Sequence, residues 1–151
     1  MPRIAFDAYM AGVIDSDGSF SMVKRLKQST IRGYHYSTVF QLTWKKSSFA
    51  EKVLKLIKQR YGGHISPWQR KPNKYSKESI ECLKYAVESS GLEKLIILTL
   101  PYICLKKEQA LLIKKVREIR KIKPKTRNKP NKFWEEEDKI YEELKKLHKE
   151  I

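Results

Sequence analysis

Hydrophobic and polar positions along the chain follow two periods, and the changes between them mark out its elements. Residues 8–14, AYMAGVI, are almost wholly apolar and predict a short helix, for which Asp7 is a candidate N-cap. Residues 20–27 and 34–45 instead alternate apolar with polar side chains, which is typical of half-buried strands. A polar turn at 28–33 separates them, so the pattern predicts a helix followed by a β-hairpin.

A second helix and a second pair of strands follow this hairpin. Apolar residues at helical spacing predict a helix over 48–61, with Ser48 and Glu51 as a capping box. Residues 64–71 and 79–87 predict two further strands. The predicted buried stripe of the helix consists of Phe49, Val53, Leu56 and Ile57.

Helical periodicity dominates the rest of the chain. It predicts helices over 89–99 and 105–121, then a basic loop at 121–132 and an amphipathic C-terminal helix within 131–151. The order helix, two strands, helix, two strands, helices indicates an α+β fold, in which one curved, four-stranded antiparallel sheet is backed by helices. We expect a single domain over residues 1–151, because this length suits one hydrophobic core and is short for two.

The charge balance indicates what kind of partner the chain binds. The chain has 33 Lys and Arg against 17 Asp and Glu, a net charge of +16. Residues 131–151 carry more acids than bases, so the excess lies in the preceding part of the chain. A basic body of this kind favours a polyanionic partner, and nucleic acid is the leading candidate. The alternative is a soluble, lysine-rich protein whose charges serve only solvation.

Other composition features narrow the class of protein. Cys82 and Cys104 are two isolated cysteines in apolar or strand-like segments, which favours reduced, structural thiols in an intracellular compartment. The most apolar run, 95–105, is too short to span a membrane and contains Pro101. The abundance of Lys, Glu and Ile is typical of thermophilic proteins. The three histidines are scattered and form no recognisable general-base constellation.

The first predicted helix carries two features that a simple core helix does not need. Ala8, Ala11 and Gly12 place small side chains where a second helix could approach closely. Asp15 and Asp17 lie at the carboxyl end of the helix, where the helix dipole disfavours negative charge. Two carboxylates at such a place indicate a cation as their counterpart, and Mg²⁺ is the simplest choice because it prefers oxygen ligands.

The segment MAGVIDSDGSF at residues 10–20 resembles the LAGLIDADG motif of the homing endonucleases over about ten consecutive positions. The resemblance extends over nearly the whole chain and implies the αββαββα fold of that family. The motif occurs once, and family members with one copy act as homodimers. Their motif helices pack through small residues, which maps onto Ala8, Ala11 and Gly12, and the two-fold symmetry implies a nearly palindromic DNA site.

The resemblance also implies the chemistry. The last acidic residue of the motif is a metal ligand in the family, which maps onto Asp17, and the carbonyl of Ser16 can add a further oxygen. Lys106 closes the segment PYICLK, which is similar to a family stretch whose lysine approaches the scissile phosphate. The implied activity is Mg²⁺-dependent cleavage of double-stranded DNA in intron homing, with Ca²⁺ or Mn²⁺ able to occupy the site. For Asp15, a metal-ligand role and a helix-end hydrogen-bonding role both remain open.

One position departs from the family pattern. Where better-known homodimeric members carry a polar residue that orders water beside the active site, this chain has Trp44. Either Lys45, Lys46 or Ser48 takes that role, or the arrangement of water differs.

The polar face of the predicted sheet supplies the candidates for DNA contact. Arginine and lysine can bind guanine or phosphate, and glutamine and serine can bind base edges, whereas a merely solvated face is the alternative. The candidates are Ser21, Arg25, Lys27, His35, Ser37, Gln41, Ser66, Trp68, Arg70 and Lys84.

Two rival functions share the predicted fold and the basic face. The first is an RNA maturase that binds intron RNA and aids its splicing, without metal-dependent cleavage. The second is a catalytically inactive DNA-binding regulator. Because Asp15, Asp17 and Lys106 are all present, the sequence favours the nuclease.

Overall fold

The computed structural model describes residues 2–29, 32–122 and 131–150. The predicted basic loop at 121–132 falls mostly outside these residues. The elements are α1 (Arg3–Asp17), β1 (Ser19–Leu26), β2 (Tyr34–Lys45), α2 (Ser48–Tyr61), β3 (His64–Arg70), β4 (Ile80–Val87), α3 (Ser89–Thr99), α4 (Lys107–Ile122) and α5 (Asn131–Glu150). This is the predicted α+β class. None of the described helices is both long and apolar enough to cross a membrane.

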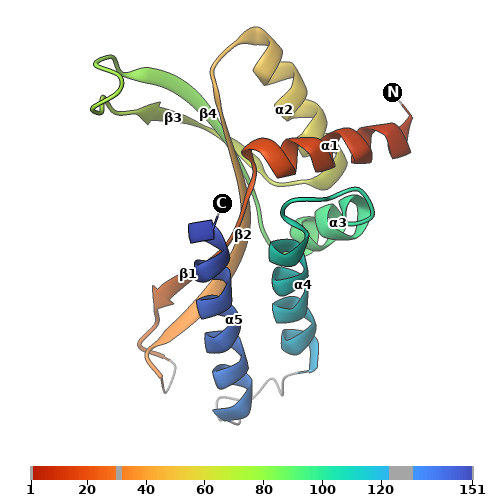
Figure 1. Ribbon diagram of the computed structural model, residues 1–151, viewed down its shortest axis with the longest axis vertical. Helices are drawn as coiled ribbons and strands as arrows, with labels where there is room; N and C mark the ends of the chain where they lie inside the picture. The colour runs from red at the N-terminus through yellow and green to blue at the C-terminus, as the bar shows by residue number, and fades with distance from the viewer. Residues whose placement is uncertain (1, 30–31, 123–130, 151) are drawn as a thin grey trace.

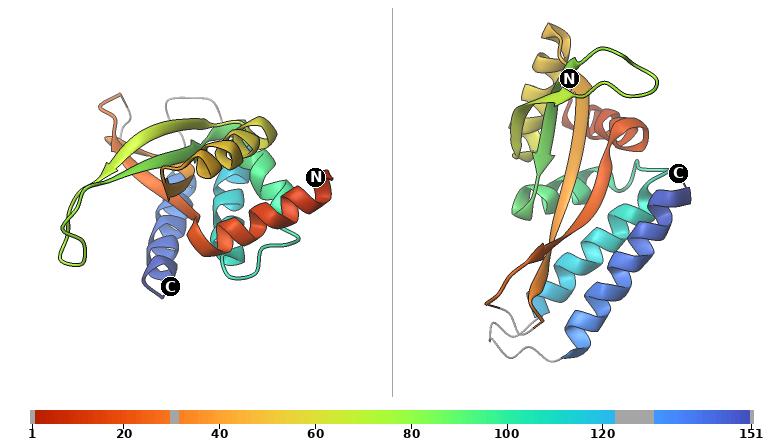
Figure 2. Two further views of the ribbon diagram at one scale, coloured as in Figure 1. Left: turned by 90° about the horizontal axis from the view of Figure 1, so that it is seen from above. Right: turned by 90° about the vertical axis from the view of Figure 1, so that its left-hand side faces the viewer.

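The four strands form one antiparallel sheet in the order β1-β2-β4-β3. The sheet is strongly twisted, so the β1–β2 and β3–β4 hairpins diverge from a crossing near the middle of β2 (Figure 1). Helices α1, α3, α4 and α5 lie together to one side of it, as two further views show (Figure 2). Helix α2 packs against β3 and β4.

One face of the sheet packs on the core and the other does not. Successive residues of a strand point to opposite faces, and residues paired across strands share a face. In β2 the alternate residues Tyr36, Phe40 and Leu42 are buried in the core cluster, as the sequence predicts. Their neighbours in the chain therefore point to the opposite side, which we call the open face.

Helix α1 begins earlier than the sequence pattern predicts. It starts at Arg3, after Pro2, so Asp7 lies within the helix and is not its N-cap. Asp7 is buried because α2 supplies its partners: Arg60 donates two hydrogen bonds, at 3.1 and 2.8 Å, and the Tyr61 hydroxyl donates one at 2.6 Å. The N-cap prediction was wrong because a buried tertiary partner took the carboxylate.

Helix α2 has the predicted bounds but a different buried stripe. Its buried residues are Ala50, Leu54, Ile57 and Tyr61, whereas Phe49 and Leu56 are 74% and 52% exposed. Both stripes have helical spacing, so periodicity alone cannot choose between them. The Tyr61 hydroxyl bonded to Asp7 fixes the phase. The N-cap is Ser47, whose Oγ accepts from the Ala50 N–H at 3.0 Å, and not Ser48.

Helix α5 is attached to the β1–β2 hairpin through buried charge. Glu137 is 2% exposed and accepts hydrogen bonds from Arg32 at 3.0 Å and Arg120 at 3.2 Å. The neighbouring Asp138 accepts from the hydroxyls of Tyr34 and Tyr36. A buried charge is tolerated only when it is paired in this way, so the network fixes the position of α5.

Candidate active site and nucleic-acid interface

The end of α1 is placed against the sheet by a glycine. The Gly18 N–H caps the helix by donating to the carbonyls of Val13 and Ile14, at 3.1 and 3.2 Å. A Cβ on Gly18 would lie 2.5 Å from the Phe40 ring, so only glycine allows this approach without a shift. The preceding residue, Asp17, is consequently held at the junction of α1 and β1, with its side chain exposed.

The carboxylate of Asp17 has a partner that the sequence did not predict. The indole Nε1 of Trp44, near the end of β2, donates to Asp17 Oδ2 at 2.9 Å. The structure records no other hydrogen bond to this carboxylate within the described ranges. Oδ1 is therefore available to a ligand.

Asp15 is engaged within the protein. Its carboxylate accepts hydrogen bonds from three consecutive backbone N–H groups, those of Cys104 at 2.9 Å, Leu105 at 3.1 Å and Lys106 at 3.0 Å. These groups precede α4, where backbone donors lack helical partners. This geometry corresponds to the hydrogen-bonding role, one of the two roles that the sequence left open for Asp15.

Lys106 lies beside the two acids. Its side chain crosses to the end of α1, where Nζ donates to the Gly18 carbonyl at 2.5 Å. The residue is 9% exposed, and burial lowers the pKa of its ammonium group, an effect that the nearby charges of Asp15 and Asp17 partly offset. The site thus contains a partly desolvated cation next to an available carboxylate.

The ligand set of one chain is small. No group of three or more His, Cys, Asp or Glu side chains that could hold a metal ion occurs among the described residues. Asp17 with the backbone carbonyl of Ser16 provides oxygen donors only. Mg²⁺ is usually bound by one or two carboxylates together with substrate phosphates and water. These residues therefore fit a Mg²⁺ site that other molecules complete.

The open face gathers the predicted DNA-binding residues. Strand pairing sets Arg25 opposite His35, Ser66 opposite Lys84, and Trp68 opposite Cys82. By the same alternation, the remaining predicted residues within the strands also point to this face. They are Ser21, Ser37, Gln41 and Arg70. Lys27 directly follows β1, and its N–H donates to the Gly33 carbonyl at 2.8 Å.

His35 lies among these basic residues. Burial, and then the positive charges of Lys27 and Arg25, lower the pKa of His35 below its ordinary value of 6.5. Its Nδ1 is buried and has no hydrogen-bond partner among the described residues. The lowered pKa favours the neutral imidazole, which offers one donor and one acceptor.

The outer face of α1 is not covered by any element among the described residues. Ala8 and Gly12 are exposed, and a Cβ on Gly12 would have nothing within 4 Å. The larger side chains of Ile4 and Tyr9 are 71% and 41% exposed. Ala11, predicted with Ala8 and Gly12 as a dimer contact, is instead fully buried in the core of its own chain. We call the outer surface of Ala8, Tyr9 and Gly12 the exposed α1 face.

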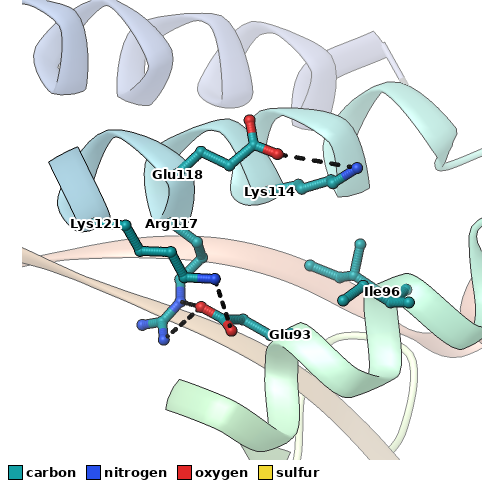
Figure 3. A pocket seen from close by; sticks show the side chains of 7 residues that line it. Glu93, Ile96, Lys114, Arg117, Glu118 and Lys121 are labelled. Carbon is teal, nitrogen blue, oxygen red and sulfur yellow. Dashed lines mark hydrogen bonds and ion pairs between the residues drawn. The ribbon is translucent and has the colours of Figure 1, made fainter.

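A pocket between α3 and α4 is not part of this site (Figure 3). Its charged lining is paired within the chain: Glu93 contacts Arg117 at 3.0 Å and Lys121 at 3.3 Å, and Lys114 contacts Glu118 at 3.9 Å. None of the predicted site residues lines it.

Solved structures provide the comparison. The homing endonuclease I-CvuI, in complex with its target and Ca, is 19% identical, with a TM-score of 0.73 over 96% of this chain and 83% of that one. An archaeal intron-encoded homing endonuclease complexed with DNA, I-Vdi141I, is 22% identical, with a TM-score of 0.74 over 97% and 86%. The homing endonuclease I-TnaI is 15% identical, with a TM-score of 0.66 over 95% and 96%. This chain has the LAGLIDADG homing endonuclease fold. No family model and no curated protein matches the sequence.

Within the LAGLIDADG fold, α1 is the motif helix and the sheet is the predicted curved one, so the predicted fold is confirmed. The structure brings Lys106 beside Asp17, although the two residues are 89 positions apart in the sequence. One signal for the missed contact was present in the sequence: Trp44 stands where the LAGLIDADG resemblance implies a polar side chain. Its hydrogen bond to Asp17 was not foreseeable, because it depends on how β2 meets α1 in space.

Proposed function

We propose that this protein is a homing endonuclease that binds a long, nearly palindromic DNA site as a homodimer and cuts both strands with the aid of Mg²⁺. The observation that carries the proposal is the exposed carboxylate of Asp17, which keeps one oxygen available beside the buried ammonium of Lys106. The proposed biological role is intron homing. Similarity to nucleases supports the reaction class.

Each residue of the proposed site would have a separate role in the reaction. Asp17 and the carbonyl of Ser16 would hold the metal ion, which supplies charge stabilisation and lowers the pKa of bound water. Lys106 stabilises negative charge that develops on the scissile phosphate, and its partial desolvation strengthens that interaction. Asp15 positions Lys106 by binding its backbone N–H at 3.0 Å.

A homodimer is proposed because one chain offers half of what double-strand cleavage needs. One Asp17 serves one strand, and the chain contains a single motif. The exposed α1 face supports the pairing, since Ala8 and Gly12 allow close approach while Tyr9 adds apolar surface. A second copy packed there would bring two Asp17 carboxylates toward one axis.

The open face is the proposed DNA-binding surface. A two-stranded ribbon fits the major groove, and this face carries Arg25, Arg70 and Lys84 among polar side chains. The structures of I-CvuI and I-Vdi141I contain DNA, which supports the same partner for this chain.

Cleavage of a supercoiled plasmid tests the proposal against its two rivals. The plasmid carries the insertion site of the intron that encodes the protein and is incubated with and without Mg²⁺. We expect linear product only with Mg²⁺. Binding without cutting would instead support the inactive regulator, and preference for folded intron RNA over this duplex would support the maturase.

A further inference from the structure

Trp44 is the hydrogen-bond partner of the carboxylate on which the proposed reaction depends. We infer that Trp44 is a positioning residue that fixes the Asp17 carboxylate through Oδ2 and so keeps Oδ1 available to a divalent cation. The inference rests on the proposed function, because it assigns a role within that metal site. The contact that carries it is the 2.9 Å hydrogen bond from the indole Nε1.

The need for such a partner follows from the exposure of Asp17. A carboxylate at a solvent-exposed helix end turns easily about its terminal torsion, whose preferences are broad. Trp44 is itself held firmly: it pairs with Leu83 across the sheet and packs against the core cluster. The hydrogen bond therefore transfers the rigidity of the sheet to the carboxylate.

The chemistry of indole limits what Trp44 can do. Indole has one N–H donor and no lone-pair acceptor, so it can neither coordinate a metal ion through a lone pair nor accept a conventional hydrogen bond from water. It occupies one lone pair of Asp17 and adds no ligand of its own. Partners of this kind, which orient a ligating carboxylate, typically contribute 10- to 100-fold in metal affinity or activity.

The neighbouring polar residues do not share this role. Lys45 is paired with Cys82, on the open face, so its side chain leaves the sheet away from Trp44. Lys106 instead fixes the next residue along the chain, through the Gly18 carbonyl. Asp17 is thus restrained at its side chain by Trp44, and the residue that follows it, Gly18, is held at its carbonyl by Lys106.

Titration of Ca²⁺ into the full chain bound to its insertion-site duplex tests the inference by calorimetry, independently of cleavage. Trp44→Phe keeps an aromatic ring and removes the N–H donor, and we expect it to weaken Ca²⁺ binding by about 10- to 100-fold. Trp44→Gln restores an N–H donor and should recover most of the affinity. Trp134→Phe, in α5 and away from the open face, is the matched control and should leave Ca²⁺ affinity unchanged. Thermal unfolding of each variant checks that the fold is retained.

Terbium luminescence gives a second readout of the same site. An indole hydrogen-bonded to the carboxylate that would hold the ion should sensitise Tb³⁺, so Trp44→Phe should lose the signal that Trp134→Phe retains. Wild-type Ca²⁺ affinity in Trp44→Phe, or affinity as weak in Trp44→Gln as in Trp44→Phe, would overturn the role of Trp44. Wild-type Ca²⁺ affinity in Asp17→Asn would instead overturn the proposed metal site itself.

Discussion

The side chain of Lys106 reaches across to the end of the motif helix and donates to the carbonyl oxygen of Gly18, 88 residues away in the sequence, at 2.5 Å. This contact joins the segment before α4 to the junction of α1 and β1. It also buries an ammonium group, and burial lowers its pKa. The protein therefore accepts a stability cost at the place where a cation is useful for phosphate chemistry.

The first prediction concerns this cost. Lys106→Met keeps the length of the side chain and removes the buried charge, so we expect unchanged or higher thermal stability together with loss of cleavage. The stability advantage of Lys106→Met over the wild type should shrink at alkaline pH. Because the folded-state pKa of Lys106 is lowered, the wild type becomes more stable as pH rises through that pKa. Lys107→Met, at an exposed neighbouring position, should change neither property. Full cleavage by Lys106→Met would contradict the role given to Lys106.

The second prediction concerns the exposed α1 face. A Cβ on Gly12 would meet no atom of the described residues within 4 Å, so Gly12→Leu should fold normally. It should nevertheless prevent close approach of two α1 helices and convert the protein to a monomer, measured by analytical ultracentrifugation. Lys115→Leu adds the same side chain at an exposed position of α4 and should leave the dimer intact. A wild-type protein that is monomeric even with its duplex would remove the basis for two paired sites.

The third prediction is a pH effect far from the active site. Burial alone would raise the pKa of Asp7, but its hydrogen bonds from Arg60 and Tyr61 outweigh burial and hold the pKa below its ordinary value of 3.8. The resulting stability is fully present above that value and is lost as pH falls through the lower folded-state pKa. Asp7→Asn should lower the free energy of unfolding by about 2 kcal/mol at neutral pH.

The difference between Asp7→Asn and the wild type should close in strong acid, as followed by denaturant unfolding at several pH values. Glu88→Gln is the control, because Glu88 is paired with Arg25 at the surface, where both side chains are about half exposed. A pH-independent difference for Asp7→Asn would show that the carboxylate charge is not what stabilises this contact.

The fourth prediction concerns DNA binding. Affinity should fall steeply as salt rises, because many phosphates are neutralised on the open face. Arg70→Gln should reduce the slope of log affinity against log salt by about 1 if Arg70 contacts a phosphate. Lys115→Gln, on the helical side, should leave that slope unchanged. A flat salt response in the wild type would argue against a charged binding face.

Local patterns predicted much of the fold because each depends on neighbouring residues. Alternation defined β2, and the bounds of α2 and α3 were also anticipated. The phase of α2 was not, because a second apolar stripe containing Phe49 and Leu56 fits the same period. The burial of Leu54 in the core and the hydrogen bond between Tyr61 and Asp7 distinguish them.

The candidate site was predictable to the extent that it lies in one motif. The helix end marked both Asp15 and Asp17, and Asp17 could be chosen because the resemblance maps the family's metal ligand onto it; the open face followed from alternation along the strands. The contacts of Trp44 and Asp15 depend on segments that meet only in the folded chain. Sequence reasoning could mark Trp44 as unusual, but its partner required the structure.

The fifth prediction tests the central claim, that metal held by Asp17 cuts DNA. Asp17→Asn removes the carboxylate charge without touching the open face, so cleavage should be lost while affinity for the insertion-site duplex stays near that of the wild type. Cleavage by the wild type and by Asp17→Asn is compared in Mg²⁺, with duplex binding measured on the same preparations. Linear plasmid from the wild type alone, at equal binding, is the predicted result. Near-normal cutting by Asp17→Asn would contradict the account.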